Sequence, residues 1–218
     1  MNLTITTEPP FEPVTLTEAY LHLRIDPEGS PPVHPDDDMI LRHITASRKN
    51  VELMARRALV QQSLRLSVPG FPVSRDLWWM APGRNLMVIA IRLLRPPIFS
   101  VSSVEYYDGT NTLQTISASD YYITDEQVPE LKFVSGFANP TLYDRPDALR
   151  VNYTAGYTPT GSPPTTQSEY AANVPEGLKE AILLGVQLLY DNLKPDDYVA
   201  VFRAQESLVQ PYRIQLTP

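Results

Sequence analysis

Cysteine is absent from the 218-residue chain, and glycine is scarce, with 9 residues against 22 prolines. The absence of cysteine excludes disulfides, thiolate metal ligands and a cysteine nucleophile. The prolines cluster in short stretches, which indicates compact pieces joined by stiff connectors rather than a uniformly flexible chain. Hydrophobic residues make up 43% of the sequence, which is enough to build a core.

Long apolar runs and an excess of basic residues are also missing. The longest apolar runs, such as residues 86–91, are far shorter than the ~20 residues that span a bilayer. The first 15 residues lack the basic and apolar regions of a signal peptide. The formal net charge of -7 argues against a protein that binds nucleic acid by neutralising phosphates. We therefore expect no membrane association and no dedicated nucleic-acid site.

Motifs for catalysis and cofactor binding are missing as well. The sequence has no phosphate-binding loop, no dinucleotide-binding glycine pattern, no zinc-protease motif and no serine nucleophile elbow. The three histidines, His22, His34 and His43, include no pair at the spacing of a helical metal site. The aspartate run at 36–38 fits the start of a helix better than a metal site. We expect no catalytic residue, no metal and no cofactor.

Amphipathic helices are predicted near both ends of the chain. Residues 15–25 open with a capping box formed by Thr15 and Glu18. Residues 36–59 carry one apolar stripe, with acidic residues at the start and basic residues at the end. The third helix lies within 173–195, where the Lys-Pro pair at the end is interpreted as its stop signal. Its apolar face is so wide that the other helices or a neighbouring subunit must cover it.

Between the second and third helices the hydrophobic period becomes that of strands. Residues 60–68 alternate between apolar and polar side chains. Turn signals such as Asp108-Gly109 separate further short strand-like segments at 86–93, 99–107, 121–124, 131–134 and 148–156. Strands without intervening helices favour an antiparallel sheet, a sandwich or a small barrel.

The predicted fold class is α+β: a helical unit from both chain ends with an inserted antiparallel β unit, a small sandwich or barrel, and an extended C-terminal tail. The helical unit is assigned to 13–59 and 173–209, and the β unit to 60–156. Residues 157–172 are rich in Pro, Thr and Ser and are predicted to be a linker or mobile loop. A short helix is expected to end near Val209, followed by an extended tail over 210–218.

A tryptophan pair is the one candidate for stacking on a base or a sugar. Trp78 and Trp79 lie close to Arg75 and Arg84. The favoured interpretation is that one Trp packs in the β unit and the other lies at an interface, where Trp is enriched. A carbohydrate- or ligand-binding module that uses the β unit is therefore the alternative to a structural protein. An enzyme ranks third, because no motif supports it.

Five phrases of the sequence, taken in order, resemble a known family. They are "PVTLTEAYLHLRID", "DDDMILRHITASRKNVELMARRALVQQSLRL", "RPPIFSVSSVEYYD", "LRVNYTAGY" and "VPEGLKEAILLGVQLLYDN". Together they resemble phage head–tail connector proteins of the gp6-like type, especially the longer phiE125 gp8-like group with a β insertion. The resemblance runs from about residue 13 to 214. The "WWMAPGRN" stretch and the "PTGSPPTTQSEYAA" loop depart from the familiar pattern.

This resemblance implies a structural adaptor of a tailed bacteriophage without enzymatic activity. Such proteins form a ring, typically twelve-fold, beneath the portal, extend the DNA channel and offer a platform to the next neck or tail protein. The implied partners are the portal protein, a neck, stopper or tail-completion protein, and other copies of the chain. Genomic DNA would pass through without sequence-specific binding. The implied location is the virion neck, after assembly in the host cytoplasm.

The resemblance also implies a portal-binding segment, because the C-terminal segment of such connectors reaches into the portal. Carried over to this sequence, the segment comprises Ser207, Leu208, Val209, Gln210, Pro211, Tyr212, Arg213 and Ile214.

Overall fold

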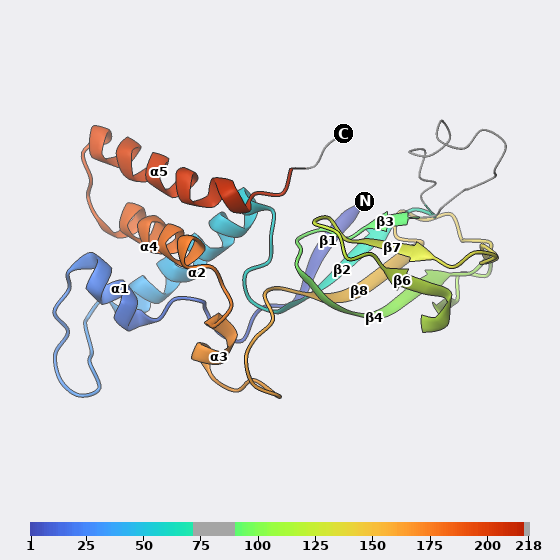
Figure 1. The fold of residues 1–218 in the computed structure, drawn as a ribbon, viewed down its shortest axis with the longest axis horizontal. Coiled ribbons are helices and arrows are strands. Elements are labelled where there is room, and N and C mark those ends of the chain that lie inside the picture. Colours follow the sequence, from blue (N-terminus) through green and yellow to red (C-terminus); the bar gives the residue numbers. More distant parts are fainter. Residues whose placement is uncertain (72–89, 216–218) are drawn as a thin grey trace. The chain divides into compact units, whose positions relative to one another are not determined.

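The computed structural model describes residues 1–71 and 90–215 (Figure 1). The chain divides into two compact units, and each unit is assembled from two separate parts of the sequence. The β unit comprises Met1–Glu8 and Gln62–Gly156, and the helical unit comprises Pro9–Gln61 and the chain from Tyr157 onwards. The predicted α+β class, with strands placed in sequence between two helical parts, is confirmed.

Two antiparallel sheets form the β unit, with strand orders β1-β2-β8-β4-β5 and β3-β7-β6. The larger sheet contains β1 (Asn2–Thr7), β2 (Gln62–Val68), β4 (Ile98–Tyr107), β5 (Leu113–Ile116) and β8 (Leu149–Ala155). The smaller sheet contains β3 (Ala90–Arg92), β6 (Tyr121–Ile123), which follows the 3-10 turn η1 (Ala118–Asp120), and β7 (Glu130–Phe133). Among the strands of the described residues both sheets stay open, so the barrel that the sequence left as one option is not formed.

Alternating burial shows why these segments are strands. Every second residue of β8 is buried, and β8 pairs with β2 in unbroken register along their lengths. Because successive side chains of a strand point to opposite faces, β2 and β8 share one buried face. The two sheets meet through side chains: the ring of Phe71, beyond β2, lies 5.5 Å from that of Phe133 in β7. The Tyr153 hydroxyl of β8 also donates a hydrogen bond to the Leu94 carbonyl, 2.8 Å away, just after β3.

The sequence predicts no element at β1 or β5, and both strands lie at the edges of the larger sheet. Most residues of both strands are exposed, with a burial pattern that lacks a fully apolar face. An edge strand is covered less than a central one, so its sequence carries a weaker alternation of apolar and polar residues. The N-terminal residues therefore join the β unit, although the helical segment follows them in the chain.

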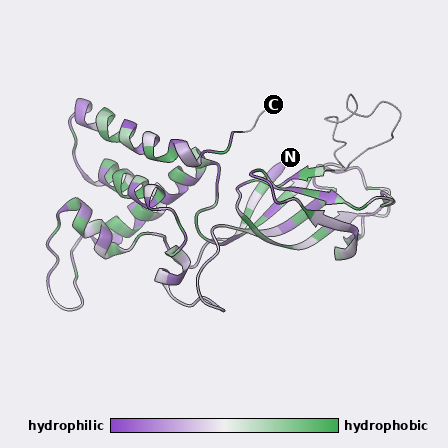
Figure 2. Ribbon diagram, in the orientation of Figure 1, coloured by the Kyte–Doolittle hydropathy of each residue, from purple (hydrophilic) through white to green (hydrophobic). Residues whose placement is uncertain are grey.

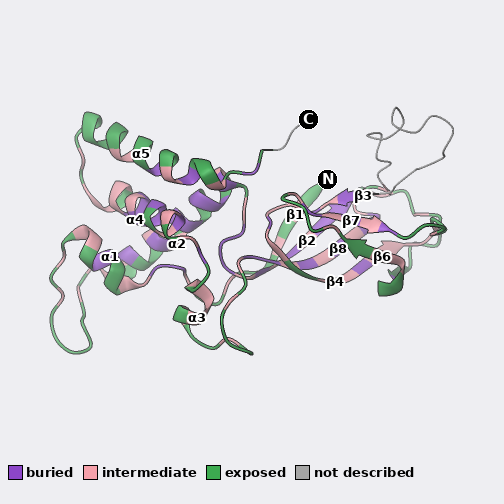
Figure 3. Cartoon of the chain, in the orientation of Figure 1, coloured by how far each residue is buried: buried purple, intermediate pink, exposed green. Residues whose placement is uncertain are grey.

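The helical unit contains α1 (Leu16–Leu23), α2 (Asp37–Ala55), α3 (Gln167–Ala171), α4 (Glu176–Tyr190), α5 (Pro195–Val209) and a 3-10 turn, η2 (Gln210–Tyr212). Apolar side chains of α1, α2, α4 and α5 form one buried cluster. Figure 2 shows apolar residues along α2 and α4, and Figure 3 shows that these helices are the most buried. No helix in the described part of the chain has both the length and the hydrophobicity needed to cross a membrane.

Gly185 in α4 allows α2 and α5 to approach α4 closely. The Ser47 hydroxyl of α2 donates to the Ile182 carbonyl at 2.7 Å, and the Gln205 Nε2 of α5 donates to the Ala181 carbonyl at 2.8 Å. A Cβ atom at position 185 would overlap with the Ser47 hydroxyl and would lie 2.6 Å from the Gln205 Nε2 atom. The three helices therefore meet at a point where only a glycine fits.

The start of α1 agrees with the prediction, but the end of α2 does not. The capping box of α1 is confirmed, since the Thr15 side chain accepts from the Glu18 amide and Glu18 accepts from the Thr15 amide. α2 ends at Ala55, before the predicted residue 59, because Arg56 has a left-handed conformation with φ of 56°. Its amide donates to the Glu52 carbonyl and closes the last turn.

The last helix is longer than the sequence suggests, and it begins where a stop was expected. Pro195 occupies the first turn of α5 instead of ending α4, which already stops at Tyr190. Proline suits this position because the amides of the first turn have no partner inside the helix. Extended backbone begins at Arg213, since residues 210–212 form η2. Within the predicted linker, α3 starts with a capping box between Thr166 and Glu169.

Candidate interaction site

The aspartate run forms hydrogen bonds with tyrosines of two other helices. Within residues 1–71 and 90–215, no group of three or more His, Asp or Glu side chains is placed to hold a metal ion. Asp36 accepts a hydrogen bond from the Tyr190 hydroxyl at 2.9 Å, and Asp37 accepts one from the Tyr20 hydroxyl. Burial, together with the bond to Asp37, raises the pKa of Tyr20 to about 12. The aspartates therefore tie the start of α2 to α1 and α4.

The predicted tryptophan pair, Trp78 and Trp79, lies outside the described residues. Their assignment to core or interface stays a sequence-based prediction.

The segment from Ser207 to Ile214 is fastened to the helical unit by its apolar residues. Val209 and Ile214 are each 2% exposed. The Ile214 amide donates to the Ala55 carbonyl at 3.0 Å, and the Arg57 Nε atom donates to the Tyr212 carbonyl at 2.6 Å. Leu208 and Tyr212 are partly buried against the same cluster. The structure therefore anchors half of the predicted portal-binding residues inside their own unit.

The other half of this segment faces solvent. Ser207, Gln210, Pro211 and Arg213 are exposed. Because their neighbours in the sequence are buried, the exposed side chains are presented on a fixed backbone. A partner that binds this segment therefore contacts these side chains and the exposed parts of Leu208 and Tyr212.

A groove of about 280 Å³ lies beside this segment, between the end of α2 and the end of α5. It is lined by Leu53, Met54, Arg56, Glu206, Val209, Gln210 and Arg213. In the described part of the chain, neither Arg56 nor Arg213 forms an ion pair through its side chain. With Glu206, the groove carries two positive charges and one negative charge. Leu53 is 63% exposed, so the groove offers apolar as well as cationic contacts.

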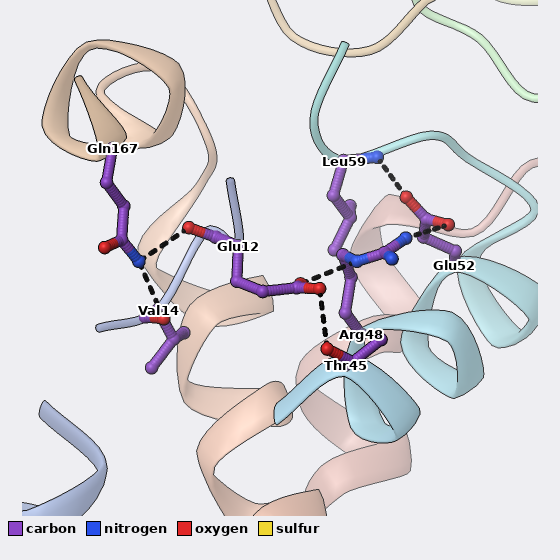
Figure 4. Close-up of polar contacts among 7 residues, drawn as sticks. All are labelled: Glu12, Val14, Thr45, Arg48, Glu52, Leu59 and Gln167. Carbon is purple, nitrogen blue, oxygen red and sulfur yellow. Dashed lines mark hydrogen bonds and ion pairs between the residues drawn. The ribbon is translucent and has the colours of Figure 1, made fainter. Parts of the chain in front are cut away.

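A buried polar network, shown in Figure 4, stiffens the helix that forms one wall of the groove. Arg48 of α2 is buried, and its guanidinium bonds to Glu12 at 2.7 Å and to Glu52 at 3.1 Å. Glu52 also accepts from the Leu59 amide at 2.9 Å, and Glu12 accepts from the Thr45 hydroxyl at 2.9 Å. The network thus fixes the chain on both sides of α2 to the helix itself.

Gln167 of α3 extends this attachment. Its Nε2 atom donates to the carbonyls of Glu12 and Val14 at 2.9 and 3.0 Å. No motif in the sequence points to a member of this network. One available signal was that Arg48 and Glu52 follow Ile44 at intervals of four residues, which places them beside the buried stripe.

No family model and no curated protein matches the sequence. Solved structures, however, share the fold. A chain from the neck of an empty GTA particle, computed with C6 symmetry, has a TM-score of 0.70 and 15% identity. A chain from the virion of a native gene transfer agent (GTA) particle has a TM-score of 0.68 and 16% identity. A chain from the neck of a native GTA particle, computed with C12 symmetry, has a TM-score of 0.64 and 16% identity.

Each of these comparisons covers 100% of this chain and 98% of the other chain. The similarity therefore includes both units and the connections between them. Over its whole length, the protein has the fold of chains found in the necks and virions of gene transfer agent particles.

Proposed function

We propose that the protein is a structural adaptor in the neck of a phage-like particle. The observation that carries the proposal is the shared fold over 100% of the chain with chains from GTA necks. The five connector-like phrases in the sequence point to the same place by an independent route, since they depend on residues and not on the fold.

In this role, copies of the chain form a ring beneath the portal, extend the DNA channel and carry the next neck or tail protein. Support comes from the neck structures that share the fold, which were computed with C6 and C12 symmetry. The net charge of -7 also suits a channel through which DNA slides without adhering, because like charges repel.

The portal-binding segment is proposed to act through its exposed side chains. Val209 and Ile214 hold the segment against the helical unit, so the exposed Ser207 and Pro211, which do not line the groove, can be presented to the portal without ordering a free tail. Binding by a preorganised segment avoids much of the entropic cost of folding a disordered tail onto its partner.

Particle assembly tests the proposal. A variant with the exposed Ser207 and Pro211 both replaced by glutamate should fold normally but yield few complete tailed particles, with portal-containing heads accumulating. Truncation from residue 207 would be a poorer test, because it removes the buried Val209 and Ile214. Arg203→Glu, at an exposed position of α5 outside the segment, serves as the control. Cryo-EM of purified particles should show the chain between portal and tail, and its absence there would refute the assignment.

A further inference from the structure

We propose that the exposed start of α5 in one copy docks into the groove between α2 and α5 of the next copy, joining the copies head to tail. The inference rests on the proposed function, since a cyclic ring requires each subunit to present two different and complementary surfaces. The start of α5 is one such surface, and the groove is the other.

The start of α5 is not covered by its own unit. Residues 195–200 are all exposed, and Figure 3 shows the contrast with the more buried end of the helix. Asp196 and Asp197 suit a helix N-terminus, where they complement the helix dipole. The helix dipole explains the exposed aspartates but does not explain why Tyr198 and Val199 are 47% and 45% exposed. These two side chains give the start of α5 exposed apolar surface, beside the two aspartates, that a neighbouring copy can cover.

The groove matches this surface in both charge and polarity. Arg56 and Arg213 supply cations for the two aspartates, while Leu53 and Met54 supply apolar surface for Tyr198 and Val199. Glu206 lowers the positive charge of the groove without cancelling it. The volume of about 280 Å³ is slightly below the range of ~300–1,000 Å³ typical of ligand pockets, so the groove accommodates side chains rather than a long peptide.

The two surfaces lie at opposite ends of one helix. α5 has 15 residues, which at about 1.5 Å per residue gives a length of about 22 Å. A rigid helix of this length keeps its own start away from its own end, so each copy can engage one neighbour at each end. An antiparallel pair of copies would also bring both surfaces together, but it would close as a dimer. Head-to-tail contact leaves both ends available for a ring.

A charge-swap experiment tests the contact in assembling particles. Arg56→Glu with Arg213→Glu, and separately Asp196→Arg with Asp197→Arg, should each lower the yield of complete particles about tenfold or more. The variant with all four changes should recover most of that yield, because the attraction is restored with the signs exchanged. Arg42→Glu with Arg203→Glu reverses the same number of charges at exposed positions of α2 and α5 outside the groove and should have little effect.

The swap also distinguishes a second copy from the portal as the occupant of the groove. If the portal binds there, the aspartate variant should assemble normally and the four-fold change should not rescue the arginine variant. Either result would overturn the proposed contact, provided that circular dichroism shows each variant to be folded.

Crosslinking tests the geometry, and the absence of native cysteine makes it straightforward. Particles containing the Leu53→Cys, Val199→Cys double variant should give a ladder of oligomers after treatment with a short bismaleimide. Each single variant should stay monomeric. The pair Leu21→Cys, Val199→Cys is the control, because position 21 is 76% exposed and lies on α1, away from the groove.

The outcomes separate this inference from the proposed function. A chain present in the neck that gives no ladder, or only dimers, refutes the head-to-tail contact and leaves the neck role intact. A chain absent from particles refutes the neck role. In that case the same crosslinking on concentrated purified protein decides whether the contact exists.

Discussion

Replacing Gly185 with alanine is expected to destabilise the helical unit. The new methyl group would overlap with the Ser47 hydroxyl, and it would lie 2.6 Å from the Gln205 Nε2 atom and 3.0 Å from the Ser47 Cβ atom. These are the groups that bond α2 and α5 to carbonyls of α4. The substitution therefore forces apart helices at the point where their polar contacts are buried.

The expected loss follows from opposing contributions. Alanine favours a helix over glycine by about 1 kcal/mol. Overpacking of a core costs about 1–3 kcal/mol, and a buried donor that loses its partner costs about 1–3 kcal/mol more. With one donor displaced, the Gly185→Ala variant should lose about 1–5 kcal/mol in its free energy of unfolding. Steric and polar costs thus outweigh the gain in helix propensity.

Urea denaturation followed by far-UV circular dichroism measures this loss. In a Ser47→Gly background the same change at position 185 should cost less, because the nearer of the two side chains that the methyl group meets is gone and only Gln205 remains. Gly70→Ala is the control, since a Cβ atom there meets no atom within 4 Å. A Gly185→Ala protein as stable as the original would refute the proposed close approach of the three helices.

Arg48→Ala should destabilise the helical unit by about 3–5 kcal/mol, because the carboxylates of Glu12 and Glu52 lose their buried cation; a loss below about 1 kcal/mol in the same urea assay would contradict this role. Hydrogen bonds from Arg145 and then Arg150 hold the pKa of Asp147 at about 2, below its ordinary value of 3.8. The stabilisation is therefore present above pH 3.8 and is lost as the pH falls toward 2. Thermal unfolding between pH 5 and 2 should show a flatter pH dependence for Asp147→Asn than for the original protein, and identical profiles would contradict the prediction.

The features predicted correctly from the sequence are those that depend on neighbouring residues. The capping box at Thr15 and Glu18 involves side chains three positions apart. In β2 and β8, the alternation of apolar and polar residues is visible in the sequence of each strand itself. The edge strands β1 and β5 were missed because their pairing partners, and not their own pattern, make them strands. Pro195 was misinterpreted because a proline after a helix and a proline that starts the next helix have the same local sequence.

In the candidate site, too, local features could be predicted and features that depend on distant residues could not. A resemblance could point to Ser207–Ile214, but it could not separate anchored residues from exposed ones. That separation depends on the Ala55 carbonyl and the Arg57 side chain, which come from the other half of the helical unit. Arg48 was missed for a related reason. A charged residue is expected to face water, and its burial becomes understandable only when Glu12 is brought to it by the fold.

The interleaving of the two units in the sequence has a consequence for synthesis on the ribosome. The first strand, β1, can pair only after β2 has been synthesised, and β2 in turn pairs with β8, which ends at residue 155. The contacts of α2 form later still, since the Ser47 hydroxyl donates to a carbonyl 135 residues further along the chain. Contacts between such distant residues slow folding, because a long loop must close before they form. Neither unit can be completed until most of the chain has emerged, and the helical unit is completed last because its final contact is made by Ile214.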